Sequence, residues 1–294
     1  MTKILAWFKS VLKGAHPDGP FEIFYENGQL KAKGNYKDGQ RDGPFESCYE
    51  DGQLESKGSF KNGVEDRPWE RYHENGQLKF RGNYKDGNLD GLQEGFHKNG
   101  QLRESQTYED GKNNDLWEFF YENGQLKSRG SYKDGKRDGS FETFYNNGQL
   151  RSKGNHKNDQ REGSYESYHE NGQLESKGAF IDGKKDGPWD GFYGNGHLES
   201  KGKYKGGKQD GSWEMFHENG QLKAKGSYTG GKREGRFEEY SQNGRLKVKE
   251  NYKNGKKDGP YESYDENGQM KSSGAFKNGV LDGSFELYED GVLQ

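Results

Sequence analysis

Histidine is the residue type in this chain most suited to binding a metal or moving a proton near neutral pH. Of the seven histidines, His73, His97, His169 and His217 recur at one position relative to the letters around them. A zinc ion needs its ligand nitrogens about 2 Å away. If each copy adds two strands, His73 and His97 would lie roughly 10 Å apart. We therefore expect no metal site and no cofactor.

Other reactive groups are no better placed for catalysis. No serine stands in a G-x-S-x-G turn, and Gly206-Gly207-Lys208 lacks the spacing of a phosphate-binding loop. Acid pairs such as Asp38 and Asp42 recur along the chain, as turn-forming residues do and active-site carboxylates do not. We expect neither an enzyme nor a small-molecule substrate.

A repeated segment must position all of these residues. FYENGQLKAKGNYKDGQRDG at residues 24–43 returns at 120–139 as FYENGQLKSRGSYKDGKRDG, and the turn glycine recurs every 24 residues from Gly28 to Gly268. A period without insertions indicates that each copy packs on its neighbours in one way. The sequence predicts an elongated all-β array of about twelve 24-residue β-hairpins over residues 16–294.

The letters also predict the turns and the register of each hairpin. Asn-Gly between alternating residues is typical of a two-residue type I′ turn, so we expect this turn at Asn27-Gly28 and a longer return at Asp38-Gly39. That turn pairs Tyr25 with Leu30, Ile23 with Ala32, and Phe21 with Gly34. On the opposite face it places Glu22 against Lys33.

An aromatic ring laid over a cross-strand glycine explains a correlated pattern in the copies. Trp117 and Gly130 form one such pair, and where the aromatic is missing, at Gln93, the glycine is missing too, at Gln106. The pairs are Phe21/Gly34, Phe45/Gly58, Trp69/Gly82, Trp117/Gly130, Phe141/Gly154, Tyr165/Gly178, Trp189/Gly202, Trp213/Gly226 and Tyr261/Gly274. Phe237 opposite Glu250 breaks this rule.

Composition excludes several classes of function. Only 26% of residues are hydrophobic and 32% are charged, which fits a thin repeat core better than a large central one. The formal net charge of −3 provides no basic field for nucleic acid. Cys48 is the only cysteine, so no disulfide framework is expected. The absence of a secretory signal pattern predicts a cytoplasmic protein.

Residues 1–15 differ from the repeats. Ile4, Leu5, Phe8, Val11 and Leu12 follow helical spacing, which predicts a short amphipathic helix. We favour a helix that caps the first hairpin, because an uncovered edge strand promotes aggregation. The alternative is peripheral contact with a membrane surface.

Residues 88–116 depart furthest from the consensus, with Gln93, Gln106, Asn114 and Asp115 at substituted positions. Relaxed constraint is one explanation. A bend or a patch specific to a partner is the other, and the residues favour neither.

The repeated letters, read as YENGQLK-x-x-G-x-Y-K-x-G-K-x-D-G, resemble the bacterial variant of the MORN repeat from residue 19 to 293. Proteins built wholly of this variant are grouped as the YwqK-type antitoxin family. The resemblance implies a non-enzymatic protein that binds and neutralises a toxin. It also leaves an alternative, a membrane-associated or structural scaffold that binds lipid or protein.

One column of polar aromatic residues is the candidate protein-binding site. Tyrosine and histidine offer contact area together with a hydrogen-bonding tip, as interface residues often do. The simpler interpretation, which we favour, is a ladder at the edge of the core. The column consists of Tyr25, Tyr49, His73, His97, Tyr121, Tyr145, His169, Tyr193 and His217.

Overall fold

The computed structural model describes residues 17–289 and 292–294, and over these residues the chain forms strands and turns without a helix. The predicted all-β repeat array is therefore observed, but the fold class needs a correction. The predicted N-terminal helix is not an element of the described fold, and residues 1–15, on which it was predicted, lie outside the described residues. The predicted boundary between residues 1–15 and 16–294 stays a prediction.

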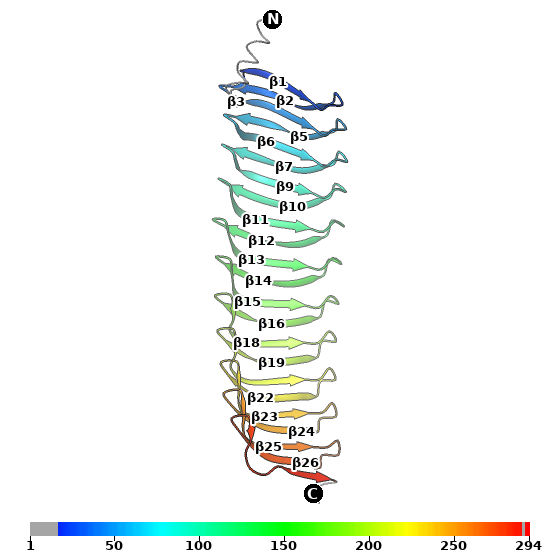
Figure 1. Ribbon diagram of the computed structural model, residues 1–294, viewed down its shortest axis with the longest axis vertical. Coiled ribbons are helices and arrows are strands. Elements are labelled where there is room, and N and C mark those ends of the chain that lie inside the picture. The colour runs from blue at the N-terminus through cyan, green and yellow to red at the C-terminus, as the bar shows by residue number, and fades with distance from the viewer. Residues whose placement is uncertain (1–16, 290–291) are drawn as a thin grey trace. The chain divides into compact units, whose positions relative to one another are not determined.

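Over the described residues the chain divides into two compact units, the first ending at Gly148 and the second beginning at Gln149. In each, strands consecutive in sequence pair antiparallel, as Figure 1 shows. The first contains β1 (Gly19–Phe24), β2 (Leu30–Lys37), β3 (Gln40–Arg41), β4 (Gly43–Cys48), β5 (Leu54–Lys61), β6 (Val64–Tyr72), β7 (Leu78–Lys85), β8 (Asn88–Leu89), β9 (Gly91–Phe96), β10 (Leu102–Glu109), β11 (Lys112–Phe120), β12 (Leu126–Lys133) and β13 (Lys136–Phe144). The second contains β14 (Leu150–Lys157), β15 (Gln160–Tyr168), β16 (Leu174–Ile181), β17 (Lys184–Lys185), β18 (Gly187–Phe192), β19 (Leu198–Lys205), β20 (Lys208–Gln209), β21 (Gly211–Phe216), β22 (Leu222–Thr229), β23 (Lys232–Tyr240), β24 (Leu246–Lys253), β25 (Lys256–Tyr264), β26 (Met270–Lys277), β27 (Val280–Leu281), β28 (Glu286–Glu289) and β29 (Val292–Leu293).

The type I′ turn and the longer loop of each repeat occur at the opposite positions from those predicted. At the first turn the amide of Gly28 donates to the carbonyl of Tyr25, and the amide of Tyr25 donates to the carbonyl of Gln29. Only Gly28, at φ 83°, is left-handed there, so the loop has three residues and the predicted two-residue turn is wrong. The type I′ turn is instead at Asp38 (φ 50°) and Gly39 (φ 77°), between the paired residues Lys37 and Gln40.

The predicted register is confirmed beyond the turn and wrong beside it. Phe21 faces Gly34, and Ile23 faces Ala32, as predicted. A bulge after Ile23 then sets Phe24, not Tyr25, opposite Leu30. The longer loop accounts for the bulge, because the extra turn residue must be absorbed in one strand.

Cross-strand pairing of Trp117 with Gly130 is also confirmed, but rings do not always cover the glycine that they face. Trp69 faces Gly82, yet a Cβ atom on Gly58, one strand earlier, would lie 2.2 Å from its indole. We call the face that carries these rings and glycines the aromatic face.

Each ring needs a glycine on at least one of its two neighbouring strands. This requirement explains which aromatic residues face a glycine and which do not. Phe237 covers Gly226, where a Cβ atom would lie 2.4 Å from the ring, so its other partner can be Glu250. Trp117 covers Gly130, because its earlier neighbour is Gln106 rather than glycine. The exception in the sequence pattern therefore follows from the same packing rule.

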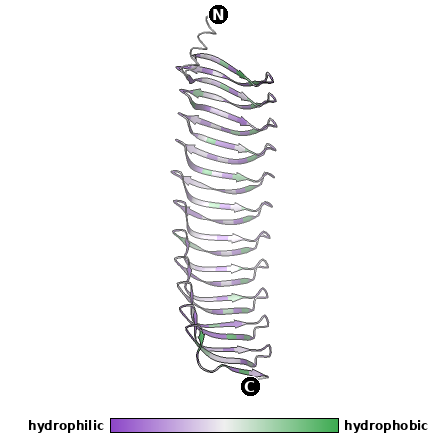
Figure 2. Cartoon of the chain, viewed as in Figure 1, coloured by the Kyte–Doolittle hydropathy of each residue, from purple (hydrophilic) through white to green (hydrophobic). Residues whose placement is uncertain are grey.

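Rings on the aromatic face pack edge to face and form the core. In the second unit, centroids of successive rings lie 5.2 to 6.4 Å apart from Tyr165 to Tyr252. Trp213 is 4% exposed and Phe237 is 3% exposed, although only one sheet layer is present in the unit. Figure 2 shows hydrophobic and hydrophilic residues interspersed along the strands, as a core on one face requires.

Cations close the outer side of this core. The guanidinium carbon of Arg233 lies 4.8 Å from the ring centre of Phe237, and the ammonium of Lys185 lies 3.8 Å from that of Trp189. Burial, aided by the nearby charge of Arg161, lowers the pKa of Lys185. Long basic side chains thus replace a second layer by covering the rings with their stems.

Candidate functional site

The predicted Tyr/His column lies at the first turn of each repeat, and its side-chain tips bind backbone. The hydroxyl of Tyr193 donates to the carbonyl of Phe216 at 2.7 Å, and Nε2 of His169 donates to the carbonyl of Phe192 at 2.8 Å. The same bond, to the strand end one repeat later, is made by Tyr25, Tyr49, His73, His97, Tyr121 and His217. Tyr145 occupies the equivalent position at the end of the first unit.

These bonds define what the column can do. A carbonyl only accepts, so each histidine must carry its proton on Nε2. Burial, and secondarily the charge of Glu199, raises the pKa of Tyr193, which keeps the hydroxyl a donor. Because one tip is used in each link between repeats, the column stabilises the array. A role in binding a partner stays a prediction for the half-buried flanks of these rings.

The Asn-Gly-Gln letters of the first turn serve the same stacking. Nδ2 of Asn27 donates to the carbonyl of Glu50 in the next turn, and Oδ1 of Asn27 accepts from the amide of Gln29. A Cβ atom on Gly52 would lie 2.7 Å from Oε1 of Gln29. The turn residues are thus fixed both by their own turn and by the next one, which makes an insertion costly.

At the opposite edge, acids link the type I′ turns. A carboxylate oxygen of Asp42 accepts from the amide of Asn62 at 3.2 Å, and one of Asp186 accepts from the amide of Gly206 at 2.8 Å. Of the recurring acids predicted to form turns, Asp38 lies in a type I′ turn as predicted, whereas Asp42 links one turn to the next. Over the residues described, no three His, Cys, Asp or Glu side chains are grouped as a metal site would require.

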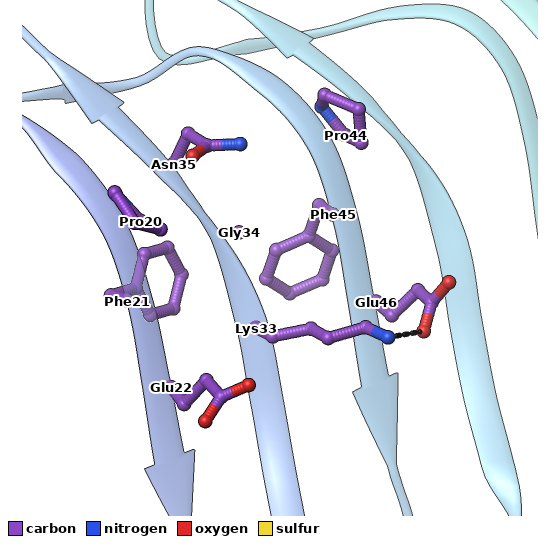
Figure 3. Close-up of a pocket in the computed structure, with 9 residues that line it drawn as sticks. All are labelled: Pro20, Phe21, Glu22, Lys33, Gly34, Asn35, Pro44, Phe45 and Glu46. Carbon is purple, nitrogen blue, oxygen red and sulfur yellow. Dashed lines mark ion pairs between the residues drawn. The ribbon is translucent and has the colours of Figure 1, made fainter.

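The second face of the sheet carries a ladder of ion pairs, and we call it the ion-pair face. Lys33 faces Glu22 in register but binds Glu46 of the following strand, with Nζ 2.7 Å from a carboxylate oxygen, as Figure 3 shows. Lys57 binds Glu70 at 2.7 Å in the same way, and the hydroxyl of Tyr72 donates to Glu70. Glu46 and Glu70 are therefore neutralised within the sheet.

Glu238 is the most enclosed member of the ladder, at 5% exposed. Burial by itself raises the pKa of this carboxyl group. Bonds from Lys225 at 2.8 Å, from the Tyr240 hydroxyl at 2.6 Å and from Arg236 outweigh burial and lower the pKa to about 2. Glu238 thus stays ionised throughout the neutral range and holds three side chains in place.

A line of short side chains lies beside the ion pairs and leaves shallow hollows in the surface of the sheet. Figure 3 shows Pro20, Asn35 and Pro44 around such a hollow, whose volume is about 510 Å³. An equivalent hollow of about 480 Å³, lined among others by Ser212, lies in the second unit. Both open on the ion-pair face at matching repeat positions, so the hollow is a feature of the repeat.

Residues 88–116 are part of the regular sheet, and their substitutions are distributed over both faces. Gln93, 5% exposed, faces Gln106 on the aromatic face, and its Nε2 donates to Glu104 at 3.4 Å. Leu92 and Leu116, exposed on the ion-pair face, were not singled out by sequence reasoning. Their large aliphatic side chains, at a position that elsewhere carries proline, serine or arginine, were the available signal.

Within the part of the chain that the structure describes, no helix is long and apolar enough to span a bilayer. No curated protein matches the chain. Among solved structures it is similar, at 12% identity, to crystal structures titled TcdB2-TccC3-Cdc42, TcdB2-TccC3-TEV and TcdB2-TccC3 without hypervariable C-terminal region.

These similarities carry no argument about shape or activity. The TM-scores are 0.17, 0.18 and 0.19, respectively. The alignments cover 95%, 90% and 97% of this chain but span only 16%, 16% and 18% of those chains.

A family match agrees with the geometry of the repeats. The family described as MORN repeat variant matches residues 17–38, 41–62, 68–86, 89–110, 116–134, 137–158, 161–182, 209–229, 233–254 and 257–278. These segments begin near one turn and end near the equivalent turn of the next hairpin, so they follow the observed repeat. Since they cover more than half of its residues, the chain belongs to the MORN repeat variant family.

Proposed function

We propose that this chain is a non-enzymatic binding protein that uses its repeated sheet surface to hold another protein. More specifically, it is an antitoxin of a bacterial cytoplasm that binds and neutralises a toxin encoded nearby. The membership of the MORN repeat variant family and the resemblance to YwqK-type antitoxins support this proposal.

The main supporting observation is that the side chains that hold the array together are distinct from those that vary on its surface. Polar groups at both turns hold the array together, as the bonds of Tyr193 and Asp186 illustrate. The positions that vary between copies, such as Leu92 and Ser212, are exposed on the sheet face instead. A scaffold with fixed edges and a variable face is suited to protein recognition.

Co-expression tests the proposal. Each gene adjacent to the gene for this chain is expressed from an inducible promoter in a bacterial host, with and without the full chain. We expect one neighbour to arrest growth, the chain to restore it, and the two proteins to co-purify. Arrest without rescue or co-purification, for every toxic neighbour, contradicts the antitoxin role. Binding without rescue would leave a binding protein that is not an antitoxin.

A further inference from the structure

Five consecutive repeats of the first unit carry an exposed apolar residue at one position of the ion-pair face. We call this set the Pro/Leu strip, and it consists of Pro20, Pro44, Pro68, Leu92 and Leu116. Leu92 is 55% exposed and Leu116 is 64% exposed, although both lie within strands rather than in turns. These residues stand on every second strand, and we take such a row of exposed apolar residues as a candidate interaction site.

Short side chains opposite the strip keep it accessible. Pro44 faces Ser59, Leu92 faces Thr107 and Leu116 faces Ser131 across neighbouring strands. Around Pro20 and Pro44 the strip is hollowed, as Figure 3 shows. A ridge of a partner can therefore reach the backbone of the sheet.

Uncompensated lysines lie beside the strip. Side chains alternate along a strand, so the last lysine of each second strand shares the face of the Lys33-type residues. In the first unit these are Lys37, Lys61, Lys85 and Lys133, and Glu109 takes the position between Lys85 and Lys133. All four are exposed, and in the described ranges none of them has an ion-pair partner, whereas the Lys33-type residues bind glutamate. The aspartates that follow three of them in sequence lie in the type I′ turns.

We propose that the Pro/Leu strip with these lysines is a docking surface for an acidic amphipathic helix of a partner protein. This inference rests on the proposed protein-binding function and assigns its surface and the chemistry of the partner. Two strands advance the sheet by about 9.6 Å. Seven residues of helix advance about 10.5 Å. Apolar residues one heptad apart on the partner helix would thus contact successive residues of the Pro/Leu strip. Glutamates of that helix would face the lysines.

The second unit supplies a matched control within the same chain. At the positions of the strip it carries Ser164, Pro188, Ser212, Arg236 and Pro260. At the lysine positions it carries Lys157, Lys205, Lys253 and Lys277, with Ile181 and Thr229 between them. The backbone geometry is equivalent and the number of lysines is the same, but serine and arginine interrupt the apolar line. Docking should therefore depend on residues of the first unit alone.

The probes are two synthetic 21-residue helical peptides with leucine at heptad core positions. One carries glutamate at the remaining positions facing the sheet, and the other carries lysine. Binding to the full chain is followed by fluorescence anisotropy at low salt. We expect the glutamate peptide to bind at least about tenfold more tightly than the lysine peptide. Equal affinities, or no binding of the glutamate peptide, overturn the inference.

Substitutions then locate the site. Leu92→Asp and Leu116→Asp should each weaken the glutamate peptide about tenfold or more, and Lys85→Glu should weaken it severalfold. Ser164→Asp and Ser212→Asp, at equivalent positions of the second unit, should change affinity less than about twofold. Circular dichroism verifies that each variant is folded. Equal losses from both sets, or binding of anionic lipid vesicles that is lost in Leu92→Asp, would overturn the inference.

The two proposals can fail separately. If a neighbouring toxin binds the chain but Leu92→Asp and Leu116→Asp leave that binding unchanged, the docking surface is wrong and the antitoxin role stands. If the acidic peptide binds at the strip but no neighbour is neutralised, the surface stands and the antitoxin role is wrong.

Discussion

Two regions of this protein solve the same packing problem with different residues. From Tyr165 to Tyr252 the rings follow one another without a break, and Trp189 and Trp213 turn towards glycines one strand earlier. In β9 to β11, glutamines fill two of the equivalent positions, and Trp117 turns the other way. The backbone register is the same in both regions, so the register does not depend on the rings alone.

The indole nitrogens show what the change of direction costs. Nε1 of Trp69 donates to the carbonyl of Ser59 at 3.0 Å, and Nε1 of Trp213 donates to that of Lys203 at 3.1 Å. Nε1 of Trp117 is buried without a partner. A buried donor left unpaired costs about 1–3 kcal/mol. Irregular repeats are therefore tolerated at a local loss of stability rather than by a change of fold.

The largest expected effect comes from filling a covered glycine in the regular region. A Cβ atom on Gly202 would lie 2.2 Å from Cδ2 of Trp213, so Gly202→Val must displace a buried indole. We expect a loss of about 3 kcal/mol in the free energy of unfolding, similar to removal of a core aromatic side chain. Urea denaturation of the full chain measures it. A loss below about 1 kcal/mol would show that the ring does not need a bare backbone.

The ion pairs of Glu238 predict a pH dependence. The pKa of Glu238 is lowered to about 2, so its contribution is complete above its ordinary pKa of 4.5 and is lost as pH falls from there through 2. At pH 7, Glu238→Gln should lose on the order of 2–3 kcal/mol. The difference between the two proteins should shrink steadily below pH 4.5. A difference that stays constant down to pH 2.5 would contradict the shift.

Restoring the consensus in the divergent region tests the coupling between ring and glycine. Gln93→Phe and Gln106→Gly are made singly and together, because these residues face each other. The space over Gly82, the glycine on the other side of residue 93, is already occupied by Phe80, so a ring at 93 needs glycine at 106. We expect each single change to destabilise the chain and the pair to recover about 1–2 kcal/mol of coupling energy, measured as a double-mutant cycle. Strict additivity would mean that the joint loss of both residues in the sequence has no packing cause.

The column at the first turn should respond equally in the two regions. Tyr193→Phe removes a hydrogen bond to Phe216, and His97→Phe removes one to Phe120. Each change should cost about 1 kcal/mol in the free energy of unfolding, the usual net value of such a bond. The same variants also test the predicted binding stripe, since a loss of partner binding larger than the loss of stability would assign the column to recognition.

The smallest effect is a gain. Arg67 has φ 68° at the position where most repeats have glycine, and a left-handed arginine is strained. Arg67→Gly should stabilise the chain by about 0.5–1 kcal/mol, after allowance for the greater freedom of glycine in the unfolded state. Asp115→Gly, at the equivalent position with φ 68°, should gain less because aspartate tolerates this conformation better. A loss of stability in both variants would be contrary to this account.

Much of the fold could be predicted from the local sequence pattern. The 24-residue period, the two strands per copy and the facing of Phe21 with Gly34 all depend on side-chain alternation and turn glycines, which sequence alone expresses. The turn types did not follow, because Asn-Gly suits both a type I′ turn and a type I turn ending in a left-handed glycine. Which loop forms depends on Asn27, which accepts from the amide of Gln29 in its own turn and donates to the carbonyl of Glu50 in the next turn.

In the candidate site, too, some features could be predicted from the sequence and others only from the structure. Sequence placed Tyr193 and His169 in one column, but only the stacked repeats brought their tips to the carbonyls of Phe216 and Phe192. Lys33 likewise has a glutamate on each side, and the structure pairs it with Glu46 rather than Glu22. Choices between two equivalent neighbours need the geometry of three adjacent strands, and no single hairpin contains it.

The amino-acid sequence by itself determined the repeat, its strand order and the residues that share a face, because these depend on contacts within one copy. The tertiary structure decided which glycine each ring covers, which acid each base binds and where apolar residues stay exposed. These outcomes differ because a strand inside a sheet has two neighbours, and the stronger of two competing contacts is settled only when both are present.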